Sequence, residues 1–184
     1  MSVLIFAGHN EIEKGVEYKD VFEHDVAALW CRILYQVHED FYKETPFLKI
    51  GKNGTLSQKI KEINTTENIE YAIDLHFNTT TAFNRSIKGS RLLYLEDDFK
   101  SYLTALVLQE KFGKLFPPNR GIKPGFFVSE STKKHRPLIF LAETKVPSFI
   151  FEPCYIQDIK QILAFDKEKA LQFLNILKET RDLY

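Results

Sequence analysis

The hydrophobic positions of the chain follow two patterns: short uninterrupted runs, and longer stretches with helical spacing. Residues Val3 to Ala7 form an uninterrupted apolar run, which is typical of a strand buried on both faces. The segment from Asp20 to Lys43 places its apolar residues at helical spacing, which predicts a long helix with one buried face. Those apolar positions are Val26, Trp30, Ile33, Leu34, Val37 and Phe41.

The rest of the chain continues this alternation of strand and helix patterns. Further strands are predicted at residues 70–78, 91–96, 126–128, 137–144 and 147–153. Further helices are predicted at 56–64, 99–116, 157–164 and 167–181. Pro117-Pro118 ends the third of the five predicted helices, and Asp166 is expected to cap the last one. Residues 49–57 and 119–125 are rich in turn-forming residues and are predicted to be connections.

Strands that alternate with helices predict an α/β protein. The sequence contains no internal repeat, low-complexity tract or second-domain boundary, so we expect one domain over residues 1–184. Its expected architecture is a central mixed, mostly parallel sheet with helices on both faces.

Composition and charge narrow the functional classes. A length of 184 residues suits one domain, since domains cluster at roughly 100–200 residues. Lys+Arg 25 against Asp+Glu 25 gives no net charge, so we expect neither nucleic acid nor a membrane surface as partner. No segment approaches the roughly 20 apolar residues of a membrane span. The N-terminus has no basic region before its apolar run, so we expect synthesis in the cytoplasm without a signal peptide.

Polar side chains with useful chemistry stand where apolar runs end. His9 follows the first predicted strand, His76 lies near the end of the 70–78 strand, and Glu152 ends the run from Ser148 to Phe151. In open α/β sheets, ligands bind beyond the carboxyl ends of the strands, so the three groups are candidates for one site. Each histidine taken alone is better explained as a hydrogen-bonded residue without function.

Glu23 is a fourth candidate, for a different reason. It shares a helical stripe with apolar residues such as Val26, Ala27 and Trp30, so it is predicted to face the sheet. A buried carboxylate needs a partner, and a metal ion would provide one. A capping box, with Asp20 as the N-cap and Glu23 three residues later, explains the same residue without any function.

The other histidines, His24, His38 and His135, are predicted to lie on the surface because their neighbours are polar or charged. His24 adjoins Glu23 and competes with it as a ligand, but the helix points it about 100° away from the apolar stripe. Two histidines and one carboxylate are a ligand set of catalytic zinc sites, which keep a fourth position open for water. The sequence has no HExxH motif, so its candidate ligands are dispersed, and their spacing alone does not decide the question.

Four short motifs together resemble a known family. In order they are AGHN, EHD at the start of a helix, IDLHFN, and FIFEPCYI. This order resembles the zinc-dependent N-acetylmuramoyl-L-alanine amidases of the amidase-3 family. Gly89 and the RGIK segment at 120–123 also fit, and the resemblance extends from about Val3 to Ile176.

The resemblance implies a role for each matching residue. His9, Glu23 and His76 would bind Zn²⁺, and Glu152 would be the general base that later passes a proton to the leaving amine. Asn78, two residues after His76, would orient a ligand or bind substrate. The implied reaction is hydrolysis of the amide bond between N-acetylmuramic acid and L-alanine in peptidoglycan.

The resemblance also implies a setting. A catalytic domain without an export signal is similar to the endolysins of bacteriophages or prophages, which reach the cell wall through a separate pore. We expect a monomer with peptidoglycan as its partner. The chain departs from the family in its compact loop after His9, which lacks an Asp-Pro-Gly run. That departure leaves the shape of the loop open.

Other functions remain open at this point. The same ligand set would serve another zinc amidohydrolase or a carboxypeptidase, and a non-catalytic relative would only bind the cell wall. Cys154 could be the nucleophile of a thiol hydrolase, although no Cys–His pattern accompanies it. The loop AGHNEIEKG could hold a phosphate, although it lacks the several glycines and the Gly-Lys-Ser/Thr of such loops.

Overall fold

A six-stranded sheet forms the centre of the molecule, with strand order β4-β1-β5-β10-β6-β7. The computed structural model describes residues 1–80, 88–128 and 135–183. The strands of the sheet are β1 (Ser2–Ala7), β4 (Leu48–Ile50), β5 (Ile69–Leu75), β6 (Ser90–Tyr94), β7 (Asn119–Pro124) and β10 (Ser148–Glu152). The first four in spatial order are parallel, whereas β6 pairs with β10 in the antiparallel sense and with β7 in the parallel sense. The predicted mixed, mostly parallel sheet is therefore confirmed.

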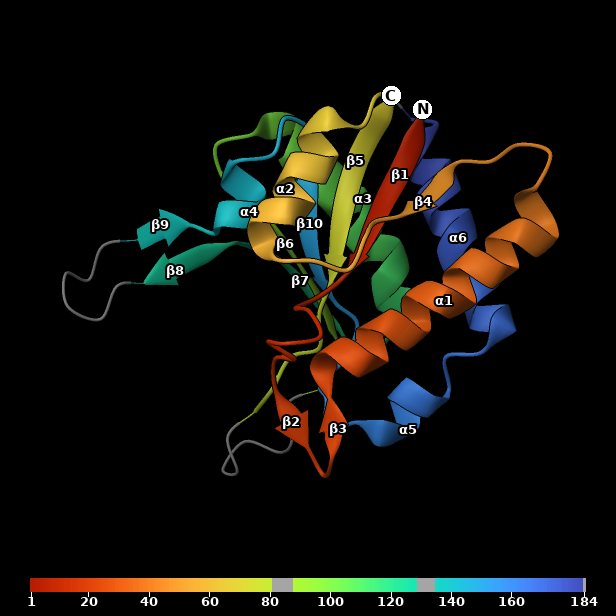
Figure 1. Ribbon diagram of the computed structural model, residues 1–184, viewed down its shortest axis with the longest axis vertical. Coiled ribbons are helices and arrows are strands. Elements are labelled where there is room, and N and C mark those ends of the chain that lie inside the picture. The colour runs from red at the N-terminus through yellow and green to blue at the C-terminus, as the bar shows by residue number, and fades with distance from the viewer. Residues whose placement is uncertain (81–87, 129–134, 184) are drawn as a thin grey trace.

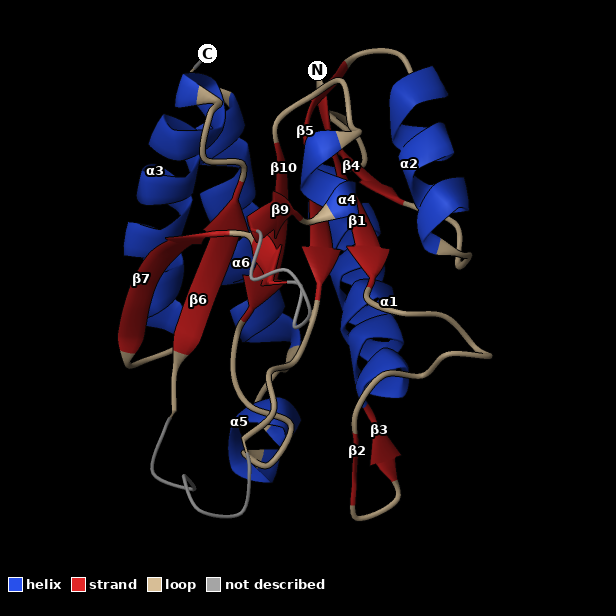
Figure 2. Ribbon diagram, turned by 90° about the vertical axis from the view of Figure 1, so that its left-hand side faces the viewer, coloured by secondary structure: helices blue, strands red, loops and turns tan. Residues whose placement is uncertain are grey.

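Helices cover both faces of this sheet (Figure 1, Figure 2). One face carries α1 (Glu23–Tyr42), α3 (Phe99–Leu115) and α6 (Lys167–Arg181), and the other carries α2 (Leu56–Thr65) and α4 (Ile139–Ala142). A short helix, α5 (Ile159–Leu163), precedes α6. Two small hairpins, β2 (Glu17–Tyr18) with β3 (Val21–Phe22) and β8 (Phe126–Val128) with β9 (His135–Pro137), lie outside the sheet.

The apolar runs of the sequence form two separate cores. In β1, Val3 and Ile5 pack against the α1, α3 and α6 layer, while Leu4 and Phe6 pack against α2 and α4. The larger core is strongly aromatic: Trp30 stacks on Phe165, with their ring centroids 3.8 Å apart. This packing holds the strands from both sides, and the carboxyl ends of the four parallel strands β4, β1, β5 and β10 lie at the same edge of the sheet.

Two predicted connections contain strand residues, which corrects the sequence-based expectation in part, although residues 51–55 connect β4 with α2 as predicted. Residues 49–57 include the end of β4, and residues 119–125 contain β7. Both strands lie at the two edges of the sheet, where one side of the backbone has no neighbour. Edge strands tolerate polar residues, Gly and Pro, so their local pattern is that of a turn.

The strand predicted at 137–144 is also wrong, because this segment forms α4. Phe140 and Leu141 are buried while Ile139 is exposed, so the apolar run has one buried side rather than two. A short apolar run does not distinguish a strand from a buried helical turn. The remaining predicted strands and helices are present at shifted ends, and Asp166 caps α6 by accepting a bond from the Lys169 amide.

The predicted capping box at the start of the first helix is absent. The helix begins at Glu23, with Phe22 as its N-cap and no side-chain cap. Lys19 and Asp20 form the tight turn between β2 and β3, with φ angles of 52° and 63°. The side chain of Glu23 therefore takes no part in capping the helix.

Cys31 and Cys154 are both free and buried, in agreement with the absence of a disulfide framework in the sequence. Among the described helices, none is long and apolar enough to span a membrane.

Candidate metal centre

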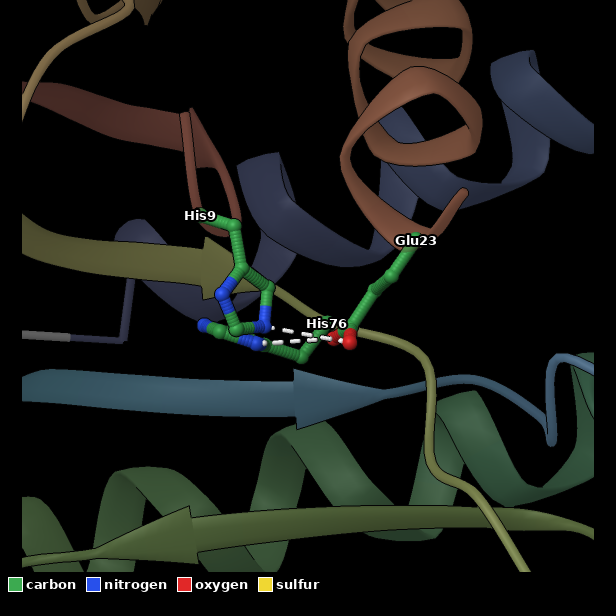
Figure 3. Close-up of side chains that lie close together, drawn as sticks. All are labelled: His9, Glu23 and His76. Atoms are coloured by element: carbon green, nitrogen blue, oxygen red, sulfur yellow. Dashed lines mark hydrogen bonds and ion pairs between the residues drawn. The ribbon is translucent and has the colours of Figure 1, made fainter. Parts of the chain in front are cut away.

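Three side chains from separate parts of the chain meet at the carboxyl ends of β1 and β5. His9 follows β1, His76 follows β5, and Glu23 is the first residue of α1 (Figure 3). Because β1 and β5 are parallel neighbours, both histidines stand at the same edge of the sheet. One ligand atom from each of the three residues lies within 4.8 Å of the others.

Glu23 is the centre of this cluster. Its Oε1 lies 2.9 Å from His76 Nδ1, and its Oε2 lies 3.1 Å from His9 Nε2. The backbone amides of Phe77 and Val16 donate to the same carboxylate at 2.9 and 3.2 Å. Burial alone would raise the pKa of Glu23, but hydrogen bonds with His76 and His9 and the charges of these imidazoles hold it well below its usual value. Glu23 is therefore an ionised, buried carboxylate.

His76 has a second partner on the other side of its ring. Its Nε2 lies 3.0 Å from Asp74 Oδ2. Burial alone would lower the pKa of His76, but the charge of Asp74 and hydrogen bonds with Asp74 and Glu23 raise it to about 10. Metal-binding histidines commonly donate their second ring N–H to a carboxylate, which leaves the first nitrogen as the ligand. Nδ1 of His76 is in that position.

The loop between β1 and α1 closes tightly around these groups. His9 itself has a φ of 59°, in the left-handed region that few side chains adopt. A Cβ atom on Gly8 would lie 2.5 Å from the Leu75 carbonyl oxygen. A Cβ atom on Gly15, whose φ is +74°, would lie 2.4 Å from His9 Cδ2 and 2.7 Å from Glu23 Oε2. The compact loop therefore depends on glycine at the point where it touches the cluster.

Glu152 lies at the end of β10, the strand next to β5. The backbone N–H of His76 donates to the Phe151 carbonyl at 2.9 Å, so this carboxylate is at the same edge as the cluster. Arg91 donates to Glu152 Oε2 through Nε at 2.9 Å and Nη2 at 2.6 Å, and Asn78 Nδ2 donates to the same oxygen at 2.7 Å. Within the described part of the chain, no hydrogen bond or ion pair holds Oε1.

His24 and His38 are buried, so their predicted surface positions are wrong. His24 Nδ1 lies 2.9 Å from the Gly8 carbonyl oxygen and its Nε2 lies 3.0 Å from Asn53 Nδ2. His38 Nε2 accepts from the amides of Phe47 and Leu48 at 3.1 and 3.2 Å. Helix α1 is covered on one side by the segment around β4, which the sequence pattern did not reveal, and this widens its buried face. His135 is exposed, as predicted.

Sequence reasoning also missed Arg91 and Asp74. Asp74 carries a signal in hindsight, because it stands two residues before His76 and therefore on the same side of the strand. The sequence gives no such signal for Arg91, because its contact with Glu152 depends on β10 being the neighbour of β6.

The donor set fits zinc. Two imidazoles and one carboxylate, with their donor atoms gathered around a common point, are the ligands of many catalytic zinc sites. The hydrogen bond that His76 Nε2 donates to Asp74, and that orients the ring, is a further feature of such sites.

Comparisons with known proteins show what this fold is. No protein-family model and no curated protein sequence matches the chain. Several solved structures do match, although their sequence identity is low. An N-acetylmuramoyl-L-alanine amidase from Clostridium difficile superposes with a TM-score of 0.77 at 15% identity, over 98% of this chain and 97% of that one.

Two further matches are catalytic domains. That of CwlV, an N-acetylmuramoyl-L-alanine amidase from Bacillus (Paenibacillus) polymyxa, has a TM-score of 0.75 at 18% identity and covers 100% of both chains. That of an endolysin targeting Clostridia difficile has a TM-score of 0.69 at 21% identity and covers 97% of both chains. The family resemblance predicted from the sequence motifs is thus confirmed at the level of the fold.

Proposed function

We propose that this chain is a zinc-dependent N-acetylmuramoyl-L-alanine amidase, which hydrolyses the amide bond between N-acetylmuramic acid and L-alanine in peptidoglycan. The observation that carries the proposal is the convergence of His9, Glu23 and His76 at the edge of a sheet with the amidase fold. The endolysin among the similar structures supports a lytic role at the cell wall, of the kind that phage enzymes have.

His9, Glu23 and His76 would hold the zinc ion, which supplies Lewis acidity toward the amide carbonyl and makes water easier to deprotonate. Glu23 brings the one negative charge of the set, and its two backbone donors fix the carboxylate in place. Asp74 holds the proton on His76 Nε2, so that Nδ1 stays available.

Glu152 would take the proton from the attacking water and later deliver it to the leaving amine of L-alanine. Arg91 and Asn78 both hold Oε2, which fixes the plane of the carboxylate and leaves Oε1 for the proton transfer. Asn78 therefore acts by orienting Glu152 in this proposal. Binding of substrate by Asn78 remains a further prediction.

The test is a digestion of purified peptidoglycan with and without metal. We expect release of stem peptides with new L-alanine amino termini, loss of this activity with EDTA or 1,10-phenanthroline, and its return with zinc. Glu67→Gln is a control for variants of Glu152, because Glu67 is an exposed glutamate that precedes β5, at the opposite end of this strand from His76. Size-exclusion chromatography of the same protein tests the expected monomer.

The products separate this function from its alternatives. Cleavage of small peptides or acyl-amino acids with muropeptides untouched would point to another zinc amidohydrolase or a carboxypeptidase. Binding to peptidoglycan without release of any peptide would point to a non-catalytic relative. Activity that survives complete metal removal would refute the zinc mechanism.

A further inference from the structure

A buried ion pair lies on the α2 side of the sheet, directly behind His76. Lys59 Nζ of α2 and Asp74 Oδ1 of β5 are 2.9 Å apart, and their side chains are only 3% and 5% exposed. Removing two charges from water costs about as much as their attraction returns, so such a pair is weak evidence for a stabilising role. The position of the pair suggests a different role.

Each member of the pair makes a hydrogen bond at the end of a strand that leads to a candidate ligand. Lys59 Nζ also donates to the Ala7 carbonyl at 2.6 Å, and Ala7 ends β1, two residues before His9. Asp74 Oδ2 contacts His76 Nε2 at 3.0 Å. One ammonium group therefore connects the ends of the two strands from which His9 and His76 project.

The two carboxylate oxygens of Asp74 have different hydrogen-bond partners. Lys59 contacts Oδ1, so Oδ2 faces His76. Asp74 and Glu23 are both carboxylates and only accept hydrogen bonds, so without a metal ion both ring nitrogens of His76 donate. A metal ion bound beside Glu23 would take the place of the proton on Nδ1, whereas Asp74 would hold the proton on Nε2. The arrangement selects the imidazole nitrogen that points into the cluster.

We propose that Asp74 and Lys59 are positioning residues of the metal centre: Lys59 fixes Asp74 and the end of β1, and Asp74 fixes the His76 ring with Nδ1 as the ligand atom. This inference rests on the proposed function in one respect, namely that the cluster binds zinc. It makes no use of the amidase reaction itself.

Asp74→Asn is the primary test, in the full chain. The single amide oxygen of the new side chain would turn to Lys59, so its NH₂ group would face His76 Nε2 and favour the proton on Nδ1. Outer partners of metal ligands are worth roughly 10–100-fold in metal affinity, and we expect a loss of that size for zinc. The readout is the zinc dissociation constant from competition with a chromogenic chelator, together with the visible absorption spectrum of the Co²⁺ form.

The double variant Lys59→Met/Asp74→Asn separates positioning from folding. Without Lys59 the amide is free to turn its oxygen toward Nε2, so we expect part of the lost zinc affinity to return. If the pair only stabilised the fold, removing Lys59 as well would bring no such gain. Thermal unfolding in EDTA reports the folding of each variant independently of zinc.

Glu70→Gln is the matched control. Glu70 is likewise a buried carboxylate of β5, 4% exposed, with Lys100 Nζ at 2.6 Å, but it stands at the other end of the strand. We expect its zinc affinity to stay within about twofold of wild type, since it contacts no ligand.

The outcomes are distinguishable. Wild-type zinc affinity in Asp74→Asn, or equal affinity in the single and double variants, would overturn the positioning role and leave the proposed function standing. Failure of the wild-type protein to bind zinc would overturn both. Zinc binding without hydrolysis of peptidoglycan would refute the proposed function and leave the positioning role intact.

Discussion

Two carboxylates stand at the same edge of the sheet, and the residues around them differ in kind. Glu23 is contacted by two imidazoles, each of which can give up a ring proton to make room for a metal ion. Glu152 is contacted by a guanidinium, which keeps its charge, and by an amide, which has none. The surroundings of Glu23 can therefore exchange protons for a metal ion, whereas those of Glu152 keep a fixed charge and a fixed orientation.

This difference between their neighbours supports the two roles that we propose, with Glu23 as a metal ligand and Glu152 as the general base. A ligand group must lose its proton when the metal arrives, and imidazoles allow that. A general base must instead regain the same position and charge after each turnover. The hydrogen bonds from Arg91 and Asn78 favour this, because they hold the Glu152 carboxylate in one orientation. The following predictions test this division.

Glu152→Gln should have the largest effect. The amide keeps the shape of the side chain but cannot take a proton, so we expect turnover of peptidoglycan to fall by about 10²–10⁴-fold. The zinc content, measured on the same sample by atomic absorption, should equal that of wild type. Loss of zinc together with activity would place Glu152 among the ligands and would contradict the separate roles proposed for Glu23 and Glu152.

The pH dependence of the metal-free protein should be the next largest effect. The pKa of His76 is raised from 6.5 to about 10, so its contribution to stability is complete below pH 6.5 and is lost as the pH rises toward 10. The pKa of Glu23 is lowered from 4.5, so its contribution is present above pH 4.5 and is lost as the pH falls. We expect the cluster to stabilise the fold most between these limits.

The measurement is urea unfolding in EDTA for wild type and His76→Gln. The difference in their free energies of unfolding should shrink from pH 6.5 to pH 10. A difference that stays constant over this range would contradict the proton exchange assigned to the cluster.

Arg91→Met should have a smaller effect on stability. It leaves Glu152 partly buried with Asn78 as its remaining partner, so we expect the free energy of unfolding to fall by about 1–3 kcal/mol. Adding Glu152→Gln should restore most of it, because the uncompensated charge is then gone. Arg32→Met is the control: Arg32 is exposed, and we expect a change within about 0.5 kcal/mol. Equal losses in the two single variants would show that Arg91 is not a specific partner of Glu152.

Iodoacetamide should have the smallest effect. Cys154 stands two residues beyond Glu152, but burial raises the pKa of its thiol well above the usual value, and burial raises that of Cys31 to about 12. We expect unchanged activity after treatment of the native protein. Inhibition that chelators do not reproduce would revive the thiol-hydrolase alternative.

The sequence predicted those parts of the site that depend on local pattern. His9, His76 and Glu152 could be placed because each ends an apolar run, and Glu23 because it begins the buried stripe of a helix. Arg91 could not be placed, because it meets Glu152 only through the antiparallel pairing of β6 with β10. Lys59 could not be placed either, because its contact with Asp74 depends on α2 packing against β5.

The same distinction holds for the fold. The central strand β1 was predicted because burial on both faces leaves an uninterrupted apolar run. The edge strands β4 and β7 were not, since half of their surroundings is solvent and their residues resemble those of turns. Local patterns report burial, whereas neighbour relations between distant strands arise only in the folded chain.

The contact of Gly15 with His9 and Glu23 sets how this loop tolerates change. In a saturation library of residues 11–15, the exposed positions Glu11, Ile12 and Glu13 should accept most substitutions, whereas every side chain at Gly15 would collide with two of the candidate ligands. In the loop that leads from the first strand to the first helix, Gly15 is therefore expected to be far less tolerant of substitution than the exposed positions before it.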